Sequence, residues 1–277
     1  MNGPRSASSL AIVVVYPDLL GTYGDGGNGL VLARRASWRG IDSHLIQAES
    51  GRPLPTADIY CIGGGEDGPG VSAAAALAAD GALGRAVAKG AVVIGVCAGF
   101  QLLGRSFPDR DDRPREGLGL LDVTTRKGTG RRAVGDLVAR PTSEAPRLPS
   151  GGELPPLIGF ENHSGATTVG TGAHPLATVV TGVGNGGGDG TEGAWSERVL
   201  GTYLHGPVLA RNPVLADLVL GWAVSPQGGL PPLVDEEETA LRQERLAAAG
   251  GSGHSRPDRR APGRWWRRDS RVQGLFR

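Results

Sequence analysis

A cysteine lies between glycines in a pattern that is typical of a catalytic nucleophile. The segment 95–99 reads GVCAG, follows an apolar run and precedes a short helical stretch. Such a strand-to-helix turn, a nucleophile elbow, requires small neighbours because the nucleophile takes a strained backbone conformation. The helix N-terminus favours the thiolate form. We predict that Cys97 is a nucleophile and that the N–H of Ala98 donates to the oxyanion formed by its attack.

A cysteine nucleophile needs a base, and the chain has five histidines. His205 directly follows an expected strand at Val199–Tyr203, so its imidazole can lie at the edge of a sheet. We predict that His205 is the base, with His163 in a similar loop as the alternative. Cys61 falls inside another expected strand, which indicates a structural role. The isolated cysteines and scattered histidines lack the ligand spacing of a zinc site, so we expect no metal.

A second glycine cluster, Gly63–Gly65, also follows an expected strand. Loops after parallel strands share one crevice, and glycine there lets backbone amides approach a ligand. A phosphate-binding loop is the rival interpretation. However, the chain contains no G-x-x-x-x-G-K-[ST] segment, and the loop at 24–29 lacks the dinucleotide-binding spacing. We therefore expect this chain to bind no nucleotide.

Alternating strands and helices are predicted to position these residues. In the first half they are strand 10–16, helix 28–39, strands 41–48 and 57–62, helix 73–89, strand 91–96 and helix 100–104. The second half is predicted to hold short strands near 118–125, 135–139, 157–160, 177–180 and 199–203, surface loops at 141–156 and 184–193, and a last helix at 212–222. The fold class is α/β, with a mostly parallel sheet flanked by helices.

Composition bounds the remaining possibilities. The 277 residues are 39% hydrophobic, which allows a sizeable core, and carry a net charge of +1. The sequence shows no membrane span and no signal-peptide pattern, and its two cysteines cannot form a disulfide framework, so a cytoplasmic location is expected. We predict one domain at 8–225, a helical extension at 226–250 and a disordered basic tail at 251–277. A tail that contacts anionic lipid or nucleic acid is the alternative.

Six segments, in their order along the chain, resemble a known family. They are 16–28 (YPDLLGTYGDGGN), 62–67 (IGGGED), 96–104 (VCAGFQLLG), 116–122 (EGLGLLD), 159–163 (GFENH) and 201–207 (GTYLHGP). Together they resemble the class I glutamine amidotransferases, and most of all the cobyric-acid-synthase-like branch. Within that branch the chain is similar to the GatD family, the glutaminase subunits of lipid II isoglutaminyl synthase.

The resemblance implies that the chain hydrolyses L-glutamine. Cys97 would attack the side-chain amide, and His205 would move the thiol proton to the departing ammonia. The N–H groups of Ala98 and Gly64 would form the oxyanion hole.

Two further residues are assigned to glutamine binding by the resemblance. Arg132 would hold the α-carboxylate because the guanidinium fork matches that group, with Arg131 as the alternative. A solvated loop arginine is the competing interpretation of Arg132. Gln101 would also contact the substrate.

The resemblance also implies a partner, a Mur-ligase-like subunit of the MurT type in a heterodimer. That subunit would use ATP to activate the D-glutamate of the lipid II stem peptide, and ammonia from this chain would convert it to D-isoglutamine at the inner face of the membrane. No cofactor is expected in this chain, and no nucleic acid. The alternatives are a cobyric-acid-synthase-like subunit that acts on a small acid, and a non-catalytic binding module with a glutaminase-like fold.

One position departs from the wider class. Many members carry a glutamate two residues after the histidine, and this carboxylate orients the imidazole. Here the position is Pro207. Either another residue of this chain substitutes for the glutamate, or a partner protein supplies an acid. We favour the partner's carboxylate, which predicts that the isolated chain is a poor glutaminase.

Overall fold

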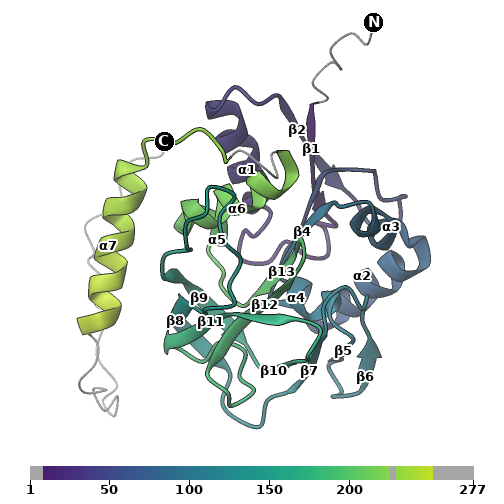
Figure 1. Ribbon diagram of the computed structural model, residues 1–277. Coiled ribbons are helices and arrows are strands. Elements are labelled where there is room, and N and C mark those ends of the chain that lie inside the picture. The colour runs from purple at the N-terminus through teal and green to yellow at the C-terminus, as the bar shows by residue number, and fades with distance from the viewer. Residues whose placement is uncertain (1–8, 225–228, 252–277) are drawn as a thin grey trace, which may run out of the picture.

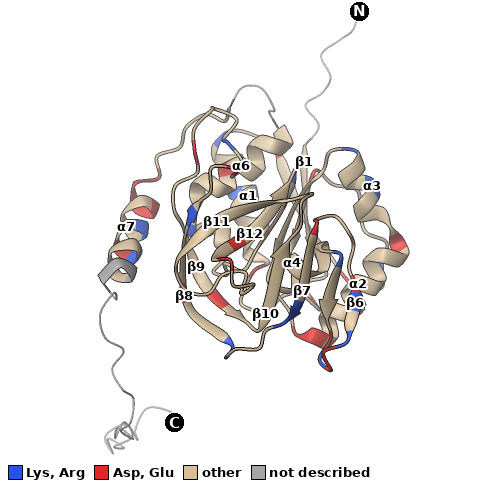
Figure 2. Ribbon diagram, turned by 60° about the horizontal axis from the view of Figure 1, so that its bottom comes forward, with Lys and Arg blue, Asp and Glu red and all other residues tan. Residues whose placement is uncertain are grey.

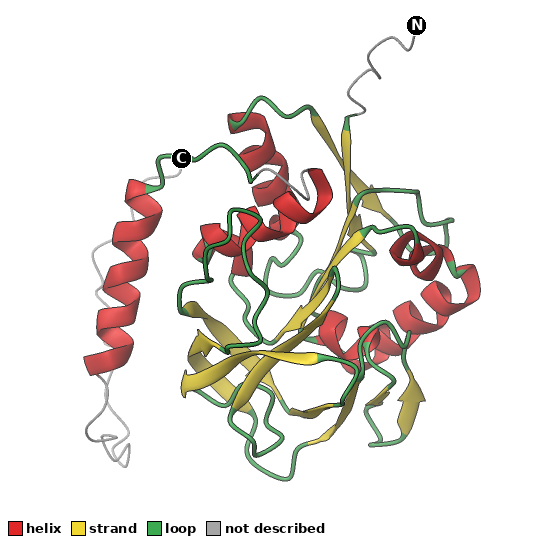
Figure 3. Ribbon diagram, in the orientation of Figure 1, coloured by secondary structure: helices red, strands yellow, loops and turns green. Residues whose placement is uncertain are grey.

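The centre of the molecule is a nine-stranded sheet with helices on both faces (Figures 1 and 3). The computed structural model describes residues 9–224 and 229–251. The strand order is β2-β1-β3-β4-β13-β12-β11-β8-β9. The first five of these strands are parallel to one another: β2 (Ser43–Ala48), β1 (Leu10–Val15), β3 (Ile59–Ile62), β4 (Val92–Val96) and β13 (Val199–Thr202). This parallel half puts the carboxyl ends of its strands at one edge.

The other half of the sheet is antiparallel. It consists of β12 (Thr191–Ser196), β11 (His174–Thr181), β8 (Ala133–Pro141) and β9 (Leu157–His163). A smaller sheet contains β10 (Gly165–Val169), β7 (Val123–Lys127), β5 (Ser106–Pro108) and β6 (Pro114–Glu116). The predicted α/β class is confirmed, and the large sheet is mixed. Strand β12 begins at Thr191, so its first three residues fall in the range 184–193 where the sequence predicts a surface loop.

Helices cover the parallel half on its two faces. They are α1 (Gly27–Trp38), α2 (Asp67–Asp80), α3 (Ala82–Ala88), α4 (Ala98–Leu103), α5 (Val208–Arg211) and α6 (Pro213–Val224). Figure 1 shows α1, α5 and α6 on one side and α2, α3 and α4 on the other. The single helix predicted at 73–89 is two helices, because Gly81 takes a left-handed conformation (φ +63°) that ends α2.

The core is richest where the parallel strands are covered on both faces. All six residues of β1 (LAIVVV) are buried, as expected for a parallel strand between two helical layers. Helix α6 contributes four further buried aliphatic side chains, Leu215, Leu218, Val219 and Leu220. In Figure 2, acidic residues interrupt β9 and β12, and basic residues lie at the end of β7.

The segment after the domain is attached by ion pairs. Helix α7 (Glu236–Gly251) occupies most of the predicted extension. Asp235, just before this helix, pairs with Arg35 of α1 at 2.7 Å, and Asp217 of α6 pairs with the same arginine at 2.8 Å. No single described helix is long and apolar enough to span a membrane, although the bent pair α2–α3 passes the length and composition test together. The tail predicted to be disordered is residues 251–277, and from residue 252 onwards it lies outside the described residues.

Candidate active site

Cys97 lies at the turn between β4 and α4. Its backbone has φ +53° and ψ −107°, a conformation that is rare for a residue with a side chain, and it is 8% exposed. The neighbours must be small because the backbones approach closely. A Cβ on Gly99 would lie 2.4 Å from the carbonyl oxygen of Ile62, and one on Gly95 would lie 2.8 Å from the backbone of Gly99. The structure therefore contains a strained strand–turn–helix elbow at this cysteine.

His205 follows the strand that lies next to the strand before Cys97. It follows β13, which pairs with β4, so both residues stand at the same edge of the sheet. The imidazole is 1% exposed, and its Nδ1 lies 2.9 Å from Oδ2 of Asp25. Its Nε2 is buried without a hydrogen-bond partner among the described residues. With Nδ1 held by a carboxylate, Nε2 is the nitrogen that remains to exchange protons.

The surroundings of His205 favour its charged form. Burial by itself lowers the pKa of this imidazole. The Asp25 carboxylate and the Cys97 sulfur raise the pKa by more than burial lowers it, so the net pKa is about 9. The group is therefore protonated at neutral pH. A buried imidazolium between a carboxylate and a cysteine is suited to donate a proton to a leaving group.

Asp25 is the residue that sequence reasoning missed. The sequence leaves two sources for the carboxylate and favours a partner protein. The structure instead supports the other alternative, a residue of this chain, because Asp25 lies against Nδ1 of His205. Asp25 lies in the loop between β1 and α1, is 1% exposed and is 180 residues away in sequence. Pro207 instead packs on the start of α1, 2.6 Å from where a Cβ on Gly27 would lie. A signal was present, since segment 16–28 contains this acid among glycines.

Gly64 belongs to the same arrangement, in a role that differs from the prediction. Its N–H donates to Oδ2 of Asp25 at 3.0 Å, so this amide is not free to bind an oxyanion. A Cβ at this position would lie 2.9 Å from Cε1 of His205. By contrast, the N–H groups of Ala98 and Gly65 have no acceptor within the described part of the chain, and both residues line the cavity beside Cys97. These two amides can form an oxyanion hole.

A small cavity of about 90 Å³ opens next to Cys97. Both Arg132 and Gln101 line it, and the amide nitrogen of Gln101 donates to the hydroxyl of Tyr203 at 3.1 Å. Arg131 lines a neighbouring cavity of about 360 Å³ instead. Of the two arginines considered from the sequence, Arg132 is therefore the one that the fold brings to the Cys97 cavity.

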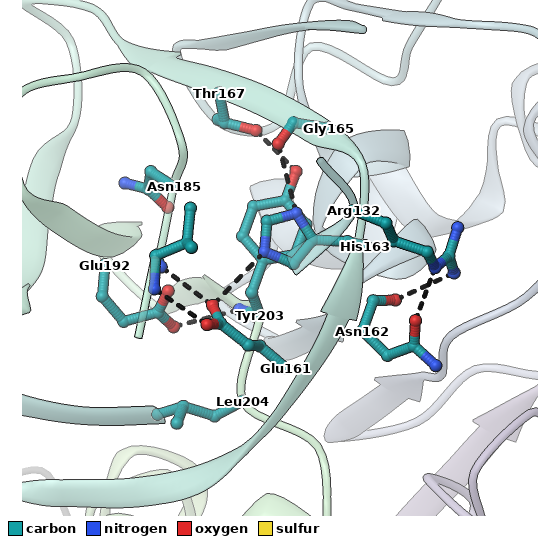
Figure 4. Close-up of polar contacts among 12 residues, drawn as sticks. Arg132, Glu161, Asn162, His163, Gly165, Thr167, Asn185, Glu192, Tyr203 and Leu204 are labelled. Carbon is teal, nitrogen blue, oxygen red and sulfur yellow. Dashed lines mark hydrogen bonds and ion pairs between the residues drawn. The ribbon is translucent and has the colours of Figure 1, made fainter. Parts of the chain in front are cut away.

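His163, the alternative base, is held by other groups (Figure 4). Its Nδ1 lies 3.1 Å from the carbonyl oxygen of Gly165, and its Nε2 lies 3.6 Å from Oε2 of Glu161. The ring also stacks on Tyr203, with 3.7 Å between the centroids. The Nε2 of His163 has no hydrogen-bond partner among the described residues, as is also true of His205, but it faces the Glu161 carboxylate. His205, whose pKa the Cys97 sulfur raises, is therefore favoured over His163 as the base for Cys97.

The second cysteine is buried in the sheet. Cys61 lies in β3, is 3% exposed, and its pKa is raised by burial to about 12. Such a thiol is not reactive at neutral pH. Within residues 9–224 and 229–251, no three histidine, cysteine or acidic side chains gather as they would around a metal ion.

Comparisons with known proteins agree with this geometry. Residues 11–213 match the family model described as the CobB/CobQ-like glutamine amidotransferase domain. The chain is 33% identical to the lipid II isoglutaminyl synthase (glutamine-hydrolyzing) subunit GatD of Staphylococcus aureus, over 79% of this chain and 86% of that one. It is 31% identical to the corresponding GatD of Streptococcus pneumoniae, over 85% and 88% of the two chains.

A cobyric acid synthase of Pelotomaculum thermopropionicum is 38% identical, but over 60% of this chain and only 33% of its own length. The two GatD subunits therefore match far more of their own length than the cobyric acid synthase does. The chain belongs to the family of CobB/CobQ-like glutamine amidotransferases, in its GatD group.

Proposed function

We propose that this chain is a glutaminase subunit that hydrolyses L-glutamine through Cys97, His205 and Asp25 and delivers the ammonia to a partner enzyme. The observation that carries the proposal is the alignment at one sheet edge. Asp25 holds Nδ1 of His205, and Cys97 follows the neighbouring strand at a strained elbow. This is the arrangement that nucleophilic acyl transfer requires.

The reaction begins when Cys97, as the thiolate paired with protonated His205, attacks the carbonyl carbon of the glutamine side-chain amide. The oxyanion that forms accepts hydrogen bonds from the N–H groups of Ala98 and Gly65. The carbon–nitrogen bond then breaks, and His205 gives its Nε2 proton to the departing nitrogen, which leaves as ammonia. Water, deprotonated by His205, attacks the resulting glutamyl thioester. The carbon–sulfur bond breaks, glutamate is released, and the Cys97 thiolate and protonated His205 are restored.

The other end of the substrate is assigned to Arg132. Glutamine carries an α-carboxylate, and a guanidinium binds such a group through two parallel hydrogen bonds. Arg132 lines the cavity beside Cys97, and Gln101 lines the same cavity. We assign the α-carboxylate to Arg132 and a supporting polar contact to Gln101.

The acceptor is proposed from the GatD relatives. Their names describe subunits of lipid II isoglutaminyl synthase, and they match most of this chain. We propose a heterodimer in which a Mur-ligase-like subunit of the MurT type binds ATP and activates the D-glutamate of the lipid II stem peptide. Ammonia from this chain then forms D-isoglutamine. A thiol nucleophile needs a reducing compartment, which favours the cytoplasm.

Amidation of lipid II in the presence of ATP tests this proposal. The chain is co-expressed with the Mur-ligase-like partner and supplied with glutamine, as wild type, Cys97→Ala or Cys61→Ala. We expect amidated product from the wild type and the Cys61 variant. The Cys97 variant should form product only when free ammonia is added.

Two other results would change the assignment. Cys97-dependent glutamine hydrolysis without a lipid II product would retain the amidase and remove this acceptor. A small acid acceptor, as in the cobyric acid synthases, would then be tested. Failure of a glutamine-analogue electrophile to label Cys97 would favour a non-catalytic binding module.

A further inference from the structure

Tyr23 covers the base in an unusual conformation. It lies in the loop between β1 and α1 and has φ +62°, which is uncommon for an aromatic residue. Its ring meets the His205 imidazole edge-on, with 4.9 Å between the centroids, although 46% of the side chain remains exposed. Backbone strain of this kind persists where the surroundings hold the residue in place.

Asn162 connects Tyr23 to the arginine of the cavity. Its Oδ1 accepts a hydrogen bond from Nε of Arg132 at 2.5 Å, and its backbone oxygen accepts one from Nη2 of Arg132 at 3.1 Å (Figure 4). Its Nδ2 donates to the hydroxyl of Tyr23. All three residues line the cavity beside Cys97. The side-chain amide thus has one end on Arg132 and the other on Tyr23.

These contacts leave one edge of the guanidinium for a ligand. Arginine has five N–H donors, and Asn162 takes the Nε proton and one Nη2 proton of Arg132. The two protons on Nη1 and the second on Nη2 remain. A carboxylate binds in bidentate fashion to such an Nη1–Nη2 edge.

We propose that Asn162 and Tyr23 are positioning residues that hold Arg132 for the α-carboxylate of glutamine. The three residues form a bridge across the cavity, called here the Tyr23–Asn162–Arg132 bridge. It joins the loop after β1, which carries Asp25, to the ends of β8 and β9. This inference rests on the proposed hydrolysis of glutamine at Cys97, and it concerns recognition of the amino-acid end of the substrate.

Two thiol reagents separate recognition from reactivity. The inhibitor 6-diazo-5-oxo-L-norleucine carries the α-carboxylate of glutamine, whereas iodoacetamide does not. Labelling of Cys97 in the full-length chain is followed by mass spectrometry at reagent concentrations below saturation. We expect Asn162→Ala to slow the reaction with the diazo inhibitor about tenfold, the effect of one hydrogen bond to a charged group. The reaction with iodoacetamide should be unchanged.

Matched variants test the individual contacts. Tyr23→Phe keeps the ring over His205 and removes only the hydroxyl, so it should slow the diazo inhibitor by a smaller factor and leave iodoacetamide unaffected. Tyr60→Phe removes a hydroxyl that bonds to the backbone of Pro55, and Arg131→Ala removes the neighbouring arginine. Neither control should change the ratio of the two labelling rates.

A double variant checks that the residues act together. Because Asn162 acts through Arg132, adding Asn162→Ala to Arg132→Ala should cause no further loss with the diazo inhibitor. Equal slowing of both reagents in Asn162→Ala would overturn the proposal, because it would indicate general damage to the site. Additive losses in the double variant would also overturn it. If wild-type Cys97 reacts with iodoacetamide and not with the diazo inhibitor, the proposed function itself fails.

Discussion

The two halves of the large sheet hold polar groups in different ways. In the parallel half the central strands β1, β3 and β4 are apolar, and polar residues stand just beyond the carboxyl ends of the strands. Asp25, Cys97 and His205 lie in loops that follow β1, β4 and β13, three of the five parallel strands. In the antiparallel half, polar side chains lie within the strands themselves, as Glu161 in β9 and Glu192 in β12 show.

The two halves of the sheet therefore use their polar side chains for different purposes. Loops at strand ends let side chains from distant parts of the chain meet in one cavity. Within the antiparallel strands, the buried acids instead bind neighbouring backbone. Glu161 accepts the N–H groups of Val183 and Gly184, at 2.8 and 2.9 Å. Glu192 accepts the hydroxyl of Thr202 and the N–H of Tyr203, so it holds the segment that leads to the base.

The largest effect is expected from a substitution of Asp25, because it removes the carboxylate from the site at the edge of the parallel half. Asp25→Asn keeps the shape of the side chain but loses the charge that holds the correct His205 tautomer, so kcat should fall by about 10³–10⁴. Steady-state glutamine hydrolysis measures this, and Asp42→Asn is a surface control. Since Asp25 belongs to this chain, the loss should be visible without a partner. An unchanged kcat would remove Asp25 from the mechanism.

The pH dependence of the same variant sharpens the assignment. The His205 pKa of about 9 lies above the ordinary value of 6.5, so its pairing stabilises the fold fully below about 6.5 and is lost as pH rises through about 9. The difference in unfolding free energy between wild type and Asp25→Asn should therefore shrink across that window. The alkaline limb of kcat/KM should move to lower pH in the variant. A limb that stays near pH 9 would contradict this account.

A smaller effect is expected at Gly64, which lies against the side chains of His205 and Asp25. In Gly64→Ala the new Cβ would lie 2.9 Å from the His205 ring and 3.0 Å from the Asp25 carboxylate, so one of them must move. We expect kcat for glutamine to fall about 10²-fold, as small displacements at a reacting centre do. Gly68→Ala is the matched control because nothing lies within 4 Å of its Cβ. Equal activities of the two variants would show that the ring is not fixed by this contact.

The smallest effect on activity is expected in the antiparallel half, at Glu192. Burial raises the pKa of this carboxyl to about 7, with Glu161 adding to the shift. The stabilisation that this group contributes is complete below about 4.5 and is lost as pH rises through about 7. Glu192→Gln keeps an acceptor for Thr202 and removes the titration. Hydrolysis should change by less than about threefold, the scale of a neutral hydrogen bond.

Thermal unfolding between pH 4.5 and 8 measures the second part of this prediction. The wild type should lose stability as pH rises through this range relative to Glu192→Gln. Parallel curves for the two proteins would show that Glu192 does not titrate in this window. A large loss of hydrolysis in the variant would instead place this half of the sheet in the catalytic machinery.

Local patterns in the sequence were enough to predict the elements around Cys97. An apolar run followed by GVCAG indicates a buried strand and a tight turn, because both depend on neighbouring residues. The strand before His205 could be predicted for the same reason. Strand β12 could not, because Glu192 and the surrounding glycines resemble a polar loop until partners for the carboxylate are known.

Asp25 and Gly64 show where prediction from the sequence ends. The contact between Asp25 and His205 joins residues 180 positions apart, and no local spacing encodes it. The prediction that Gly64 donates to an oxyanion assumed that its N–H was free. That assumption failed because the same unforeseen carboxylate accepts this N–H. One missing residue therefore caused both errors.

The position of β13 also orders events during synthesis of the chain. This strand lies between β4 and β12, so it joins the parallel half to the antiparallel half, and it carries His205 at its end. A nascent chain that has emerged only as far as residue 198 contains the thiol of Cys97 and the carboxylate of Asp25 but no base between them. The strand that joins the two halves of the sheet therefore also brings the base of the proposed mechanism. A chain truncated at residue 198 should not release ammonia from glutamine by that mechanism.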